Sequence, residues 1–381
     1  MGGNITKKNR ENKNKLQNTN NIINNNVKEK TFINSNLPND LTETNLVDFS
    51  NPKKIKFFQY LTKDSYTTSI IDYAFNIFKS INNIFYLIYA NKNKSIICLN
   101  LNNNQKINEI KNAHNEIIIN FRHYLDVINK RDLLLSLSNR LGKSNIKLWN
   151  INNFECILSL ENIYRKDNIL ATFLRNNNEN FIITCNNTIY ENDSTEPIKI
   201  FDFKGNQINI MNDSDDNSHF IDVYYDKKTL NIYIITGNRG YIKSYDYNNN
   251  KLYHKYYDKN KDQGICFSII IKNAKNTTKI ICSCNKGFIR IWNFHKKNLL
   301  NKIKICYNLL GICLWNNEYL FAGSNDKTIK LIDLEHEKVI KILNGHHNQE
   351  VTTIKKIFHP KYGECLITYG IDNIILWKNN D

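Results

Sequence analysis

The chain has 381 residues, of which 41% are hydrophobic and 12% aromatic, so it can bury a large core. Lysine and arginine total 52 against 36 acidic residues, and the net charge of +16 suits an acidic partner such as RNA, anionic lipid or an acidic protein face. A coding bias that places lysine in solvated loops also explains this charge. No apolar run is long enough to span a membrane, and the first 50 residues are too polar for a signal peptide, which predicts a soluble protein that is not secreted.

The nine cysteines lie mostly in apolar segments and form no Cys-x-x-Cys pair or other zinc-binding pattern. We therefore expect buried free thiols, no metal or other cofactor, and a reducing, cytoplasmic location.

Residues 1–52 are rich in Asn, Lys, Thr and Glu and keep no hydrophobic period, which predicts a disordered basic tail. The first six residues, MGGNIT, match the N-myristoylation pattern M-G-x-x-x-[ST], with Gly2 as the acceptor. Five basic residues follow at once, and they would face an anionic membrane: Lys7, Lys8, Arg10, Lys13 and Lys15. An acyl chain and a basic cluster together would attach the protein to a membrane, although so short a pattern also arises by chance.

From residue 53 to residue 381 the chain consists of short apolar or alternating runs between Asn, Asp, Gly and Lys clusters, which predicts an all-β domain. One hexapeptide recurs seven times: IICLNL (96–101), IKLWNI (146–151), IKIFDF (198–203), IKSYDY (242–247), IRIWNF (289–294), IKLIDL (329–334) and IILWKN (374–379). The copies are 40 to 52 residues apart, a length that holds four strands.

This repeat resembles that of the WD-repeat family, in which the third strand of each blade ends on Ile-x-Leu-Trp-Asp. The clearest single match is the segment 320–347. The resemblance implies a seven-bladed β-propeller of four-stranded antiparallel blades. It also implies that the fourth residue of each copy fills the core between blades, as do Trp149, Phe201, Tyr245, Trp292 and Ile332. Trp is replaced in four copies, so those blades are degenerate.

The resemblance further implies a hydrogen-bonded tetrad of His, Ser or Thr, Asp and Trp inside a blade. Only the last blade carries all four types, as His346, Thr368, Asp372 and Trp377. The blade of Trp149 has His114 but lacks the aspartate.

Trp377 is followed by only four residues, so the last blade lacks an outer strand of its own. The segment IKFFQYL (55–61) precedes the strands of the first blade and has the pattern of an outer strand. We therefore expect this N-terminal strand to close the ring by pairing with residues 374–377.

The turns before the hexapeptides are basic where the family usually has Asp. The residues concerned are Lys94, Arg140, Lys143, Arg239 and Lys286, and Lys327 lies beside the aspartate Asp326 of another such turn. In the family these turns share a face with the histidine loop, and that face often contacts partners. A basic rim there would attract an acidic or phosphorylated protein segment or a nucleic acid backbone. The alternative is that these residues are scattered, solvated lysines and arginines with no role in binding.

No nucleophile elbow, phosphate-binding loop or paired carboxylate stands in a fitting context, which predicts a protein that is not an enzyme and has no small-molecule substrate. We expect a protein-interaction scaffold tethered to the cytoplasmic face of a membrane. The alternative is a component of an RNA-processing or ribosome-assembly complex whose tail contacts RNA. A phosphoinositide-binding propeller lacks its Arg-Arg-Gly signature, since 238–240 reads NRG, and a ubiquitin-ligase receptor has only residues 201–204 in its favour.

Overall fold

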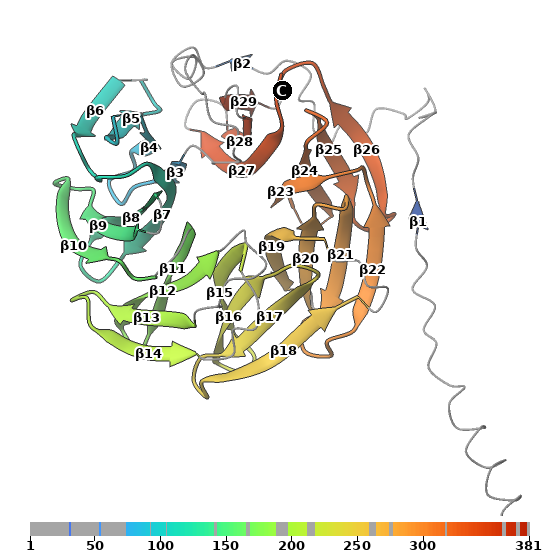
Figure 1. The fold of residues 1–381 in the computed structure, drawn as a ribbon. Helices are drawn as coiled ribbons and strands as arrows, with labels where there is room; N and C mark the ends of the chain where they lie inside the picture. Colours follow the sequence, from blue (N-terminus) through green and yellow to red (C-terminus); the bar gives the residue numbers. More distant parts are fainter. Residues whose placement is uncertain are drawn as a thin grey trace, which may run out of the picture.

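The computed structural model describes residues 74–378 except 92, 104, 141–142, 165–167, 188–196, 212–217, 259–263, 274–276, 317, 360–362 and 371–373, together with 30–31 and 53–54. The described residues form seven blades of four antiparallel strands around a central axis (Figure 1), and none of these residues is helical. The prediction of an all-β, seven-bladed propeller is confirmed. The rest of the predicted tail lies outside the described residues.

Within the first six blades the strands follow the chain from the innermost to the outermost position (Figure 1). The first three blades are β3 (Phe75–Lys79), β4 (Phe85–Ala90), β5 (Ile96–Asn100) and β6 (Gln105–Ile110); β7 (Ile118–Asp126), β8 (Arg131–Arg140), β9 (Lys143–Asn150) and β10 (Glu155–Glu161); β11 (Asn168–Asn176), β12 (Glu179–Asn187), β13 (Ile198–Asp202) and β14 (Gln207–Met211).

The fourth, fifth and sixth blades repeat this order. They are β15 (Phe220–Asp226), β16 (Asn231–Gly237), β17 (Tyr241–Asp246) and β18 (Lys251–Tyr257); β19 (Cys266–Asn273), β20 (Thr278–Cys284), β21 (Phe288–Asn293) and β22 (Leu299–Lys304); β23 (Leu309–Leu314), β24 (Tyr319–Ser324), β25 (Ile329–Asp333) and β26 (Lys338–Leu343).

The seventh blade combines the two ends of the propeller. It contains β27 (Val351–His359), β28 (Gly363–Gly370) and β29 (Ile374–Lys378), and its outer strand is β2 (Lys53–Lys54). Lys53 pairs with Leu376 and Lys54 with Ile375 in antiparallel register. Closure by an N-terminal strand is therefore confirmed, and the described pairing falls immediately before the expected segment, 55–61, which lies outside the described residues. A second short strand, β1 (Lys30–Thr31), pairs in parallel with β22.

The hydrophobic core consists of seven separate clusters, one for each pair of neighbouring blades. The fourth residue of each hexapeptide is buried in a different cluster. These residues are Leu99, Trp149, Phe201, Tyr245, Trp292, Ile332 and Trp377. One of the clusters packs Leu87 of the first blade with Ile367 of the seventh, so the two ends of the propeller share a core. Each blade is thus covered on both faces by its neighbours, which a four-stranded sheet requires.

The cysteines follow the expectation of free thiols, with three exceptions in burial. All nine are free, and six are buried. Cys156 is exposed because it lies on β10, the outer strand of the second blade, and Cys306 and Cys313 are half-buried, so the expectation of burial was wrong for these three residues.

Removal of β2 should destabilise the ring. A chain that begins at residue 55 loses the pairing of Lys53 and Lys54 with β29, whereas a chain that begins at residue 53 keeps it. We expect the shorter chain to unfold with a free energy about 1–2 kcal/mol lower, since each ladder hydrogen bond contributes about 1 kcal/mol. Urea unfolding of the two chains checks this, and equal stabilities would show that β2 does not contribute to closure.

Candidate functional site

A buried hydrogen-bond network lies in the last blade, where the tetrad was expected. The indole N–H of Trp377 donates to Thr368 Oγ1 at 2.7 Å, and Thr368 Oγ1 lies 2.8 Å from Nε2 of His347. The histidine of this network is therefore His347, and the choice of His346 was wrong. The ring of His346 instead meets Trp377 edge-on, with 5.1 Å between ring centroids. Asp372 lies outside the described residues.

A second network occupies the blade of Trp149. Its indole N–H donates to Ser136 Oγ at 2.7 Å, and Ser136 Oγ lies 2.6 Å from Nε2 of His114. Nδ1 of the same ring lies 2.8 Å from Ser138 Oγ, so a serine takes the place of the missing aspartate. Burial, and secondarily the charge of Lys147, lower the pKa of His114 to about 3, which keeps the ring neutral. A neutral His114 ring that donates from Nδ1 to Ser138 and accepts at Nε2 from Ser136 satisfies both of its nitrogen atoms.

The third blade replaces the histidine with a tyrosine. Tyr164, in the loop that enters this blade, places its hydroxyl 2.8 Å from Thr184 Oγ1 and 2.9 Å from the Thr184 carbonyl oxygen. Tyr164 and Thr184 are buried, as are the groups of the other two networks. Each of the three networks therefore fixes the loop that enters a blade to the second strand of that blade.

The basic turn residues lie on one face of the ring, which we call the turn face. The loop that enters each blade reaches the turn between the second and third strands of the preceding blade. The N–H of Cys266 donates to the Asn238 carbonyl at 3.1 Å, and the N–H of Ile305 to the Gly287 carbonyl at 2.9 Å. Because all blades run in the same direction, these turns and entering loops share a face.

Four of the six predicted turn residues have described side chains. Arg239, Lys286 and Lys327 are exposed, and Lys94 is half-buried, with its ammonium group donating to the Asn115 carbonyl. The side chains of the other two, Arg140 and Lys143, lie outside the described residues.

Glycine brings two of these basic residues to the tips of their turns. Gly240 and Gly287 follow Arg239 and Lys286 and have φ values of 82° and 77°, a conformation that other residues rarely adopt. A Cβ atom on Gly287 would also collide with the carbonyl group of Cys306.

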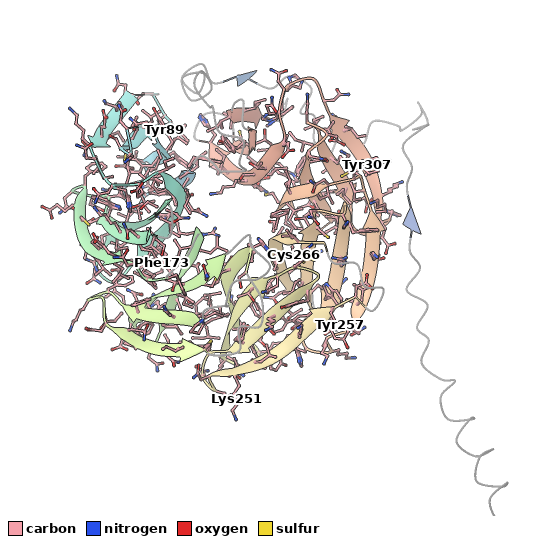
Figure 2. The ribbon with its side chains drawn as sticks, viewed as in Figure 1. Tyr89, Phe173, Lys251, Tyr257, Cys266 and Tyr307 are labelled. Carbon is pink, nitrogen blue, oxygen red and sulfur yellow. The ribbon has the colours of Figure 1, made fainter. Side chains whose placement is uncertain are left out.

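Tyr307 is a residue of the turn face that the sequence analysis missed. It is 91% exposed and lies in the loop between β22 and β23. This loop contacts the turns on either side of it, because Ile305 bonds to Gly287 and the Asn308 carbonyl accepts from the N–H of Asn325. Tyr307 therefore stands between the turns that carry Lys286 and Lys327, at the fifth and sixth blades (Figure 2). No sequence signal separates it from the other 20 tyrosines of the chain.

The acidic residue on this part of the rim is already paired. Asp326, beside Lys327, accepts from the ammonium group of the buried Lys330 at 2.5 Å and from the hydroxyl of Thr328 at 2.6 Å. These bonds hold the pKa of Asp326 below its usual range although burial opposes them. Asp326 is thus engaged by Lys330, and the exposed Lys327 presents its positive charge to the solvent.

A scan against protein-family models finds no match to this chain, and no curated protein matches it. Within the described residues no group of His, Cys, Asp or Glu is arranged to hold a metal ion. No helix in the same part of the chain is long and apolar enough to cross a membrane. The fold therefore assigns the class, a seven-bladed β-propeller, and the basic turn face is the candidate site for a partner.

The two adjacent histidines should differ in their effect on stability. His347→Ala removes a buried partner of Thr368 and should lower the free energy of unfolding by about 1–3 kcal/mol. His346→Ala is the matched control and should cost less, because it removes the edge contact with Trp377 and leaves the hydrogen bond between His347 and Thr368 in place. Thermal and urea unfolding measure both, and a larger loss for His346→Ala would contradict the assignment of His347.

Proposed function

We propose that the protein is a non-enzymatic scaffold of the WD-repeat type that binds an acidic or phosphorylated protein segment on its turn face. Propellers commonly serve as platforms for protein interactions, and function in such folds resides in the loops grafted onto the ring. The observation that carries the proposal is the exposure of Arg239, Lys286 and Lys327 on one face, with Tyr307 between two of them.

The combination of one exposed aromatic ring and flanking cations is typical of a protein-binding surface. Tyr and Arg are enriched among the residues that dominate binding energy, and tyrosine contributes a large contact area at a low entropic cost. Lys286 and Lys327 would attract an acidic segment from a distance and orient it over Tyr307. A rigid ring suits this role, because its turns need no rearrangement on binding.

Charge reversal on the turn face should abolish binding of an acidic peptide. The double variant Arg239→Glu/Lys286→Glu should bind a fluorescein-labelled decaglutamate peptide at least about tenfold more weakly than the natural chain, because attraction is replaced by repulsion. The matched control is Lys228→Glu/Lys296→Glu, which changes the net charge equally at exposed turns on the opposite face. Fluorescence polarisation at two salt concentrations measures both.

Two results of this experiment would remove the proposal. Equal losses in the two double variants would show that only net charge matters. Tighter binding of a labelled single-stranded RNA than of the peptide, lost in Arg239→Glu/Lys286→Glu, would favour the RNA-processing or ribosome-assembly alternative instead.

We further propose that the N-terminal tail tethers this scaffold to the cytoplasmic face of a membrane. The support is the sequence pattern at Gly2 and the five basic residues from Lys7 to Lys15. A single myristoyl chain binds membranes only marginally, and each basic residue near an anionic leaflet adds roughly 1 kcal/mol. The two signals together would give stable attachment.

Substitution of the acceptor glycine tests the tether directly. We expect the protein from eukaryotic expression to carry one myristoyl group and to sediment with phosphatidylserine-containing vesicles, and we expect Gly2→Ala to lose both properties. Gly3→Ala is the control, because the pattern leaves that position free. Intact-mass spectrometry and vesicle sedimentation provide the measurements. An unmodified, unattached protein would contradict the tether and favour the RNA-associated alternative.

A further inference from the structure

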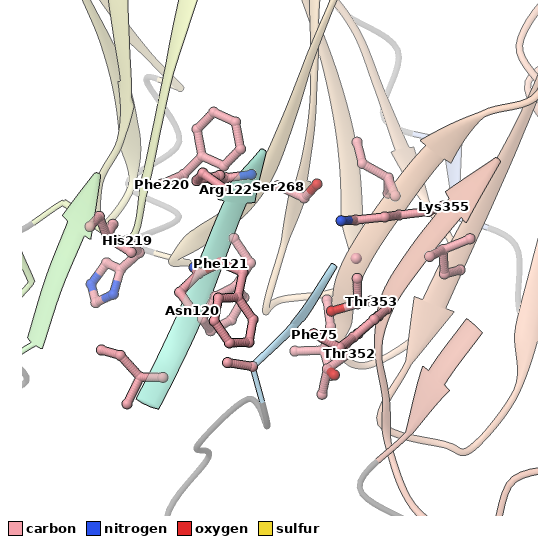
Figure 3. A pocket seen from close by; sticks show the side chains of 18 residues that line it. Phe75, Asn120, Phe121, Arg122, His219, Phe220, Ser268, Thr352, Thr353 and Lys355 are labelled. Atoms are coloured by element: carbon pink, nitrogen blue, oxygen red, sulfur yellow. The ribbon is translucent and has the colours of Figure 1, made fainter. Parts of the chain in front are cut away.

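A cavity of about 340 Å³ lies on the axis of the ring. Its walls are the inner strands of all seven blades, β3, β7, β11, β15, β19, β23 and β27, close to where each of them begins. Figure 3 shows this cavity with the side chains that line it. Because the loops of the turn face lead directly into these strands, the cavity lies at the turn-face end of the axis. Its size is at the lower limit for small-molecule pockets and suits a group the size of one side chain.

Two cationic side chains enter the cavity from different walls. Arg122 comes from β7 and Lys355 from β27, and their charged ends point toward each other (Figure 3). The ammonium group of Lys355 donates to Asn76 Oδ1 at 2.9 Å, and Asn76 in turn donates to the Phe121 carbonyl at 3.2 Å. This chain of bonds fixes Lys355 in place across three blades.

The two cations have no acidic neighbour in the cavity wall. None of the described residues that line the cavity is Asp or Glu. Nε of Arg122 is buried and has no hydrogen-bond partner within the described part of the chain. Burial and the neighbouring charge of Arg122 lower the pKa of Lys355 to about 8. An anion between Arg122 and Lys355 would compensate the charges of these two half-buried side chains.

The inner strands also deviate from regular geometry at this cavity. Four of them have register shifts there: between Ile118 and Asn120, between Cys266 and Ser268, between Leu309 and Ile312, and between Val351 and Thr353. Such bulges redirect side chains and are frequent beside binding sites. They add the hydroxyls of Ser268, Thr352 and Thr353 to the wall (Figure 3), and Thr352 Oγ1 is buried with no partner among the described residues.

We propose that this cavity binds a phosphoryl group, held by Arg122 and Lys355 and by the hydroxyls of the bulged strands. A phosphate monoester carries about −1.5 to −2 charges at neutral pH and several acceptor oxygens, which match two cations and a set of hydroxyl donors. The source of the group is a phosphorylated side chain of the partner on the turn face, because the cavity lies at that face and fits a single side chain. This assignment of the source rests on the proposed function, whereas the phosphoryl site itself does not.

Calorimetric titration of the full chain with inorganic phosphate and with N-acetyl-O-phosphoserine methylamide tests the site, with N-acetylserine methylamide as the uncharged reference. We expect both phosphate compounds to bind at millimolar concentrations. Arg122→Gln and Lys355→Gln should each weaken binding about 10- to 100-fold, since each removes a charged hydrogen bond. Lys355→Arg keeps the charge and should retain binding. Lys356→Gln is the control on the same strand, because Lys356 points to Trp315 and Glu364 and not into the cavity.

Tighter binding of the phosphoserine compound than of free phosphate would support a phosphorylated side chain as the source, and the reverse order would overturn that source in favour of a free ion. Absence of binding by the natural chain, or equal binding by Arg122→Gln and Lys356→Gln, would overturn the site. Thermal unfolding of each variant distinguishes lost binding from lost folding. The turn-face variant Arg239→Glu/Lys286→Glu should still bind phosphate, so failure of this site and failure of the scaffold proposal give different results.

Discussion

The structure depends on one constraint, which is that each blade can bury its two faces only against two neighbouring blades. A four-stranded sheet with apolar residues on both faces has no stable form by itself, and a row of such sheets would leave two faces exposed at its ends. The ring removes those ends. Leu87 of the first blade packs with Ile367 of the seventh, and β2 supplies the outer strand that the seventh blade lacks. The turn face and the central cavity both exist because the ring is closed.

This constraint explains why degenerate repeats are compatible with a regular fold. Leu99 and Ile332 occupy the same place as the tryptophans of other blades and are also buried. An aliphatic side chain is therefore sufficient to fill this position in the core between two blades. The polar networks vary in the same way. His347 in one blade, His114 with Ser138 in another and Tyr164 in a third all satisfy a buried hydroxyl. The fold requires satisfied groups and filled volume at these positions and tolerates different residues that provide them.

The sequence was sufficient to predict the blades because the third strand of each blade is buried on both faces and so keeps its apolar hexapeptide. It was insufficient for the last tetrad, because His346 and His347 are adjacent and only the path of the loop after Gly345 decides which ring turns inward. The cavity was missed for a different reason. Arg122 and Lys355 belong to strands of ordinary composition at opposite ends of the propeller sequence, and only closure brings them together.

The pairing of β2 with β29 has a consequence for biosynthesis. The first strand of this pair leaves the ribosome early, but its partner is made only after the other six blades, and at about 5–20 residues per second the interval is on the order of tens of seconds. During that time the apolar face around Leu87 has no seventh blade to cover it. A nascent chain stalled before β27 would keep this face in contact with solvent and would be a target for chaperones.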